Sequence, residues 1–231
     1  MLGVYNYTVI LTYLSIISAS IGILVSLHGD GHPFFGVFFL LLSGLFDAFD
    51  GRVARCKKDR TDIEKNYGIQ IDSLSDIVAF GVLPICIGDA MVRSMSDLSD
   101  IPFTVSDEGR TIVYPLLFFA VSIFYVTAAL IRLAWFNVTE EERQKKEAGA
   151  RKIYQGLPVT SAAIIFPTAL LLQFLSMRDL TLLYYGCLAV TGLLFISKIP
   201  ILKPGLRGIL IMVGIGAAEF AMLIYALFFI N

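Results

Sequence analysis

Two pairs of aspartates are the residues in this 231-residue chain whose spacing could do chemistry. Asp47 and Asp50 are three residues apart, and Asp72 and Asp76 are four apart. Both spacings place the two carboxylates of a pair on one face of a helix. Hard divalent ions such as Mg²⁺ and Mn²⁺ prefer oxygen ligands, and two such ions can stabilise the attacking and leaving oxygens of a displacement at phosphorus. We therefore expect these aspartates to hold two divalent metal ions, Mg²⁺ or Mn²⁺.

The four carboxylates lie at the edges of apolar stretches. An ionised group at the centre of a bilayer costs about 2.5–3.5 kcal/mol on insertion scales, so a carboxylate inside a membrane is a functional candidate. If residues 34–55 and 69–92 form neighbouring antiparallel helices, all four carboxylates meet at one depth and repel one another unless cations are bound. The alternative is a set of buried salt bridges to basic neighbours, namely Arg52, Arg55 and Lys65.

Small residues accompany the aspartates. Gly51, Ala54 and Gly68 could leave room for a ligand against the helix backbone, and Arg55 offers a planar donor fork suited to phosphate. The alternative is that the three small residues only allow close packing between membrane helices.

The composition of the chain predicts helices in a bilayer. Apolar residues make up 57% of the sequence and charged residues 16%, with a mean hydropathy of +0.77. A span needs about 20 apolar residues, and backbone groups in lipid must be satisfied within the segment. We therefore expect an all-α integral membrane protein that forms one domain over residues 1–231. The seven predicted spans are 8–27, 34–55, 69–92, 112–136, 157–177, 180–197 and 208–230.

Basic residues predict the orientation of these spans. If the N-terminus is inside, fifteen of the 18 Lys and Arg residues fall in or near the loops after the second, fourth and sixth spans. This bias predicts a multi-pass protein of the cell membrane whose aspartates lie at the cytoplasmic side. The net charge of −1 gives no indication of nucleic-acid binding.

Read together, the residues form the pattern Asp47-x-x-Asp50-Gly51-x-x-Ala54-Arg55, a spacer, and Gly68-x-x-x-Asp72-x-x-x-Asp76. This pattern resembles the signature of the CDP-alcohol phosphatidyltransferase family. The twelve-residue spacer 56–67 is longer than the roughly eight residues usual in that family, a difference of about one helical turn.

The resemblance implies a fold and a set of roles. It implies a six-helix core over about residues 5–200 with an extra C-terminal span over about 205–231, and a homodimer. The four aspartates would ligate two divalent ions, and Asp76 would also be the catalytic base. The residues implied to bind the CDP moiety are Gly51, Ala54, Arg55 and Gly68.

Two further segments bear on the acceptor alcohol. Residues 132–137, Arg-Leu-Ala-Trp-Phe-Asn, and the triplet Gly156-Leu157-Pro158 resemble integral-membrane phosphatidylserine synthases. That resemblance implies CDP-diacylglycerol and L-serine as substrates, with an acceptor pocket formed by Arg132, Asn137, Arg151 and Lys152. Alternatively, Arg132 snorkels to the interface, Trp135 belongs to an aromatic belt and Pro158 starts a helix.

Other functions remain open at this point. The same chemistry could use inositol, inositol phosphate, glycerol phosphate or choline as the acceptor, or an archaeal ether lipid as the donor. A cation transporter could also carry intramembrane aspartates, but it predicts carboxylates spread across the bilayer and an inverted repeat. Glu219, in the last span, is expected to be protonated or hydrogen-bonded between helices.

Overall fold

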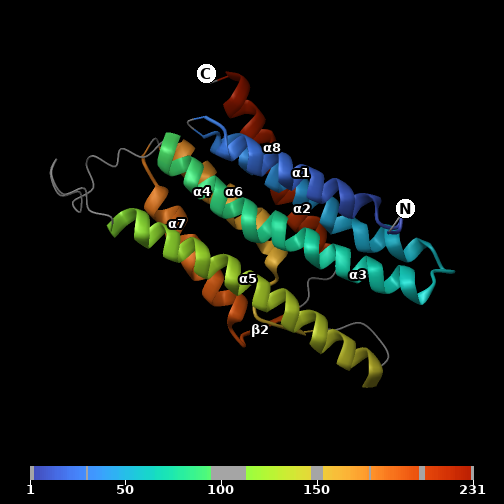
Figure 1. Cartoon of the computed structure of the whole chain (residues 1–231). Coiled ribbons are helices and arrows are strands. Elements are labelled where there is room, and N and C mark those ends of the chain that lie inside the picture. Colours follow the sequence, from blue (N-terminus) through green and yellow to red (C-terminus); the bar gives the residue numbers. More distant parts are fainter. Residues whose placement is uncertain are drawn as a thin grey trace.

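The structure is a computed structural model that describes residues 3–29, 31–94, 113–146, 153–176, 178–202 and 206–229. Nearly all of these residues are helical (Figure 1). The elements in chain order are α1 (Ile10–Leu27), α2 (Pro33–Cys56), α3 (Asp62–Asp76), the π-helical turn η1 (Ile77–Val82), α4 (Leu83–Ser94), α5 (Val113–Lys146), β1 (Ile153–Gln155), the 3₁₀ turn η3 (Val159–Ser161), α6 (Ala162–Ser176), α7 (Thr181–Ile196), β2 (Pro200–Leu202) and α8 (Leu206–Phe229).

The predicted all-α class is confirmed, because each of the seven predicted spans coincides with a helical segment. Within the described residues, four helices are long and apolar enough to cross a bilayer: Ile10–Leu27, Pro33–Cys56, Asp62–Ser94 and Leu116–Arg143. The chain is therefore a multi-pass membrane protein. The helices α6 and α7 have only 15 and 16 residues, fewer than we predicted, because a 3₁₀ turn precedes α6 and 178–180 are not helical.

The segments α3, η1 and α4 follow one another without a break, and Pro84 explains the π turn between them. Proline has no N–H and its ring crowds the carbonyl of the preceding turn, so the regular hydrogen-bond ladder opens there. The Phe80 carbonyl, four residues earlier, instead accepts a hydrogen bond from the buried Tyr125 hydroxyl of α5 at 2.7 Å. The Pro84 carbonyl accepts one from Tyr184 of α7 at 2.8 Å. Two neighbouring helices therefore stabilise the turn that follows Asp76.

Polar side chains hold α1 against α2. The Ser43 hydroxyl donates to the Ser15 carbonyl at 3.0 Å, and the Ser18 hydroxyl donates to the Phe39 carbonyl at 2.9 Å. These side chains are small, so the two backbones can approach closely, as is common between membrane helices.

A short ribbon that the sequence did not predict connects the later helices. β1 pairs antiparallel with β2, with Tyr154 opposite Ile201. α5 also extends beyond the predicted span 112–136 and continues as one 34-residue helix to Lys146. Ion pairs at helical spacing, such as Glu141 with Lys145 at 2.7 Å, favour this extension.

The helix α8 packs against α2 and α6. The rings of Phe38 and Phe220 lie 4.9 Å apart between α2 and α8. Glu219 is 7% exposed and accepts a hydrogen bond from the Thr168 hydroxyl of α6. The last span is thus attached to the bundle by apolar contact and by the hydrogen bond between Thr168 and Glu219.

Candidate functional site

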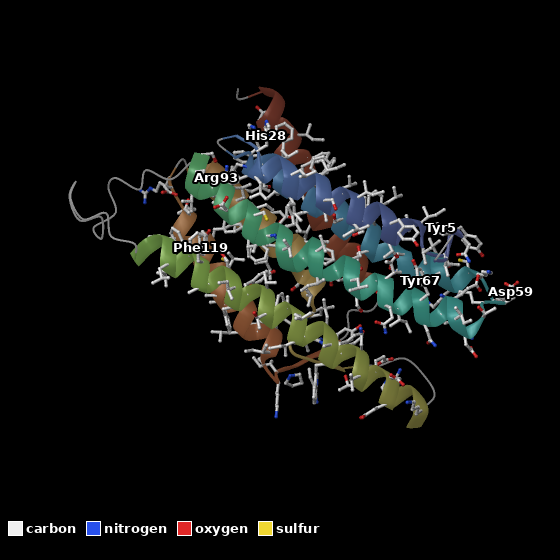
Figure 2. The ribbon with its side chains drawn as sticks, in the orientation of Figure 1. Tyr5, His28, Asp59, Tyr67, Arg93 and Phe119 are labelled. Carbon is white, nitrogen blue, oxygen red and sulfur yellow. The ribbon has the colours of Figure 1, made fainter. Side chains whose placement is uncertain are left out.

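The two aspartate pairs come from helices that the chain connects directly. α2 ends at Cys56 and α3 begins at Asp62, so only residues 57–61 turn the chain back. Arg55, Lys57 and Lys58 lie at the end of the bundle that contains this connection. Figure 2 shows Tyr5, Asp59 and Tyr67 at this end, with His28 and Arg93 at the opposite end.

The structure brings the aspartate side chains together. Asp47, Asp50 and Asp72 each place one carboxylate oxygen within 4.8 Å of the others. The Asp76 carboxyl is within hydrogen-bond reach of that of Asp47, and the Asp50 carboxyl within reach of that of Asp72. Asp50 and Asp76 are only 9% and 8% exposed. Four carboxylates therefore share one small and largely buried volume.

These carboxylates fit a cation better than a salt-bridge network. Among the described residues, no ion pair joins any of the four aspartates to a basic side chain, and the Asp72 Oδ1 atom is buried without a hydrogen-bond partner. The Lys65 ammonium pairs with Asp62 instead, and Arg52 lies over the Phe49 ring. Three carboxylate oxygens gathered within 4.8 Å of one another form the all-oxygen donor set that a hard divalent ion takes.

The glycines beside the aspartates leave open space. A Cβ at Gly68 would meet nothing within 4 Å, and one at Gly51 would meet only the Arg55 guanidinium, at 3.5 Å. By contrast, a Cβ at Gly44, which precedes Asp47 in α2, would lie 2.5 Å from the Ala163 Cβ. Gly44 thus serves helix packing, whereas Gly51 and Gly68 do not. The face next to the carboxylates has room for a ligand, with the half-buried Ala54 and the exposed Arg55 beside it.

The spacer 56–67 is mostly helix rather than loop, because α3 begins at Asp62. Thr61 caps α3 through a capping box with Glu64. The Glu64 carboxylate also accepts hydrogen bonds from Lys57 at 2.6 Å and from Asn6 at 2.7 Å. The Lys57 bond raises the pKa of that ammonium above its ordinary value. One carboxylate thus connects the N-terminal segment, the 57–61 connection and the first turn of α3.

The predicted acceptor residues occupy two different positions. The Asn137 amide on α5 donates a hydrogen bond to the Ser73 hydroxyl at 2.7 Å, directly beside Asp72. Arg132 is 6% exposed, and its Nε donates to the Leu157 carbonyl at 3.0 Å. Arg132 is therefore neither a snorkelling side chain nor open to solvent. Arg151 and Lys152 lie outside the described residues.

The triplet 156–158 has a backbone role. Gly156 has a φ of +77°, and a Cβ there would lie 2.7 Å from the Ser197 carbonyl oxygen. Its N–H donates to the Ile199 carbonyl at 2.8 Å, and the next N–H donates to the Leu194 carbonyl. A glycine is required at this position because the chain passes so close to the end of α7. The turn presents the Leu157 carbonyl to Arg132.

Thr12 and Glu64 are two residues at this end of the bundle whose contacts the sequence did not predict. The Thr12 hydroxyl of α1 donates to Asp50 Oδ2 at 3.0 Å, although 38 residues separate them. Glu64 lies in the spacer 56–67 and forms the capping box at the start of α3. The spacing of Thr12, Ser15 and Ser18 was the available signal, since it predicts one polar face on an otherwise apolar helix.

The fold and the site define a class of protein: a helical membrane protein with a buried carboxylate cluster beside an open, glycine-lined face. The family model for CDP-alcohol phosphatidyltransferases matches residues 5–196. The chain belongs to the CDP-alcohol phosphatidyltransferase family.

Individual relatives agree with the family. A CDP-diacylglycerol–serine O-phosphatidyltransferase of Saccharomyces cerevisiae is 34% identical over 57% of this chain and 40% of its own length. An archaetidylserine synthase of Methanothermobacter thermautotrophicus is 33% identical over 71% of this chain and 58% of its own length. A CDP-diacylglycerol–serine O-phosphatidyltransferase of Helicobacter pylori is 27% identical over 79% of this chain and 67% of its own length. The chain thus covers less than two thirds of the first two relatives.

Proposed function

We propose that this protein transfers a phosphatidyl group from CDP-diacylglycerol to L-serine and produces phosphatidylserine and CMP. The observation that carries the proposal is the convergence of Asp47, Asp50 and Asp72 within 4.8 Å, next to the open face at Gly51 and Gly68. Family membership supports the reaction class, and the names of the relatives support serine.

The carboxylates would hold divalent ions with the help of the substrate phosphates. Asp47, Asp50, Asp72 and Asp76 are the proposed ligands, and the ions would neutralise charge on the diphosphate as the bond between the two phosphates breaks. We propose that Gly51, Ala54, Arg55 and Gly68 contact the CDP moiety. The Arg55 guanidinium is exposed and lies over Gly51, so it can reach a phosphate without leaving a buried partner.

Asp76 is the proposed base. It would take the proton of the serine hydroxyl while that oxygen forms a bond to the lipid-side phosphorus. The bond from this phosphorus to the CMP oxygen breaks, and CMP leaves with the electron pair. Burial holds the Asp76 side chain in place, and Asp47 lies within hydrogen-bond reach of it.

The acceptor would bind between α3 and α5. Asn137 is the best-placed candidate because its amide bonds to Ser73, the neighbour of Asp72. Arg132 would position the 156–158 turn through the Leu157 carbonyl rather than meet the serine carboxylate directly. Arg151 and Lys152 remain proposed partners for that carboxylate.

An ether-lipid donor is a second candidate, since one relative carries the name archaetidylserine synthase. It would leave the chemistry at the aspartates unchanged.

We further propose that the site faces the cytoplasm, following the distribution of Lys and Arg. A homodimer is also proposed. Gly214 and Ala218 are exposed four residues apart on α8, a pattern that suits close helix contact.

Release of CMP by purified protein in detergent tests the proposal. The reaction contains CDP-diacylglycerol, Mg²⁺ or Mn²⁺ and one acceptor: L-serine, myo-inositol, glycerol 3-phosphate or choline. We expect release with serine alone, and no release by Asp76→Asn. Asp89→Asn is the matched control, because Asp89 belongs to the same continuous helical segment but pairs with Arg93 at the opposite end. Release with a different alcohol would overturn serine, and no release with any acceptor by folded protein would favour ion transport.

A further inference from the structure

The hydrogen bond of Thr12 differs from those of Thr127 and Thr139, two other threonines inside helices. Thr127 and Thr139 each donate to the carbonyl four residues earlier in their own helix. This local bond is the usual one for a threonine inside a helix. The Thr12 hydroxyl instead crosses from α1 to Asp50 Oδ2 on α2, at 3.0 Å. Its single proton is therefore committed to a carboxylate of the aspartate cluster.

The surrounding contacts fix Thr12 in this position. Its side chain is buried, with the residue 4% exposed. The Thr12 carbonyl accepts a hydrogen bond from the Ser75 hydroxyl of α3 at 3.4 Å. One and two turns along α1, Ser15 and Ser18 bond to α2. Since α1 is held by both α2 and α3, the hydroxyl donor has little freedom to move away from Asp50.

We infer that Thr12 is a positioning residue for Asp50 that raises the affinity of the aspartate cluster for divalent cations. A carboxylate with one oxygen held by a donor cannot rotate freely, so its orientation toward the cluster is set before an ion arrives. Partners that orient metal ligands in this way typically contribute about 10–100-fold to metal affinity. The inference rests on the proposed function only in that both assign a cation to these aspartates.

Binding of Mn²⁺ to purified protein in detergent, measured by electron paramagnetic resonance without substrate, tests the inference. Thr12→Val keeps the shape of the side chain and removes the hydroxyl, and we expect about a tenfold weaker Mn²⁺ affinity. Thr12→Ser keeps the hydroxyl and should stay within about threefold of the unmodified protein. Ser18→Ala is the matched control, because it removes an α1–α2 hydrogen bond away from the aspartates. It should leave the affinity unchanged.

Activity gives a second readout. In Thr12→Val, the Mg²⁺ concentration for half-maximal CMP release should rise about tenfold, while the rate at saturating Mg²⁺ changes by less than about threefold. Equal Mn²⁺ affinity in Thr12→Val and the unmodified protein would overturn the inference, as would an equal loss in Ser18→Ala. If Thr12→Val does not fold, Thr12→Ala gives the same comparison with the same expectation. Mn²⁺ binding without CMP release from any acceptor would refute the proposed function but not this inference.

Discussion

Substitution of Gly68 by alanine should raise the stability of the protein and lower its activity. Gly68 lies in the interior of α3, and a Cβ added there would meet nothing within 4 Å. Alanine in place of glycine inside a helix stabilises by about 0.5–1 kcal/mol. For a chain of this size, that gain corresponds to a rise in the thermal midpoint of about 1 to 4 °C.

The same methyl group should impair the reaction if the open space receives the nucleotide. One extra carbon in a fitted pocket costs about 1–3 kcal/mol, so kcat/KM for CDP-diacylglycerol should fall by about tenfold or more. The assay combines thermal unfolding in detergent with initial rates of CMP release over a range of CDP-diacylglycerol concentrations. Gly186→Ala is the control, because a Cβ at this α7 glycine also meets nothing within 4 Å. It should leave kcat/KM unchanged.

Two results would refute this reasoning. A Gly68→Ala protein with an unchanged kcat/KM would show that the open face next to Asp72 does not bind the nucleotide. A lower thermal midpoint would show that the space at Gly68 is filled by protein.

Other substitutions test the supporting structure. Tyr125→Phe should lower the free energy of unfolding by about 1 kcal/mol, measured by thermal unfolding, because the Phe80 carbonyl loses its donor. Gly156→Ala should cost about 1–3 kcal/mol in the same measurement, since its φ is +77° and the new Cβ meets the Ser197 carbonyl. Asn137→Ala should raise the KM for serine roughly tenfold in steady-state assays and leave the KM for CDP-diacylglycerol unchanged. An unchanged free energy of unfolding in Tyr125→Phe or Gly156→Ala would contradict the role given to that residue. An unchanged KM for serine in Asn137→Ala would contradict a role of this residue in binding the acceptor.

The aspartate cluster could be predicted because the spacing within each aspartate pair determines which helix face the pair shares. Spacings of three and four place Asp47 with Asp50, and Asp72 with Asp76, on common helix faces, and a short connection then brings the two faces together. The structure also shows which glycines serve helix packing. Gly51 and Gly68 border open space, whereas Gly44 packs against Ala163.

The contacts that the sequence did not predict join distant segments or short elements. The bond between Thr12 and Asp50 joins residues 38 apart, and the polar face of Thr12, Ser15 and Ser18 does not indicate which helix it contacts. β1 and β2 have three residues each, too few for an alternating pattern to be visible. Pro84 removes one backbone donor from its helix, and only the packing of α5 shows that the Tyr125 hydroxyl replaces that donor at the Phe80 carbonyl.

Incorporation of radiolabelled L-serine into lipid, measured during a Mg²⁺ titration, tests most directly whether the aspartate cluster carries out the transfer. The comparison requires the unmodified protein, Asp72→Asn and the control Asp89→Asn. We expect label in the lipid fraction that depends on Mg²⁺ and disappears with a chelator. The label should be retained in Asp89→Asn and fall at least about a hundredfold in Asp72→Asn. Incorporation by Asp72→Asn at the unmodified rate, or incorporation that persists without divalent ions, would contradict this expectation.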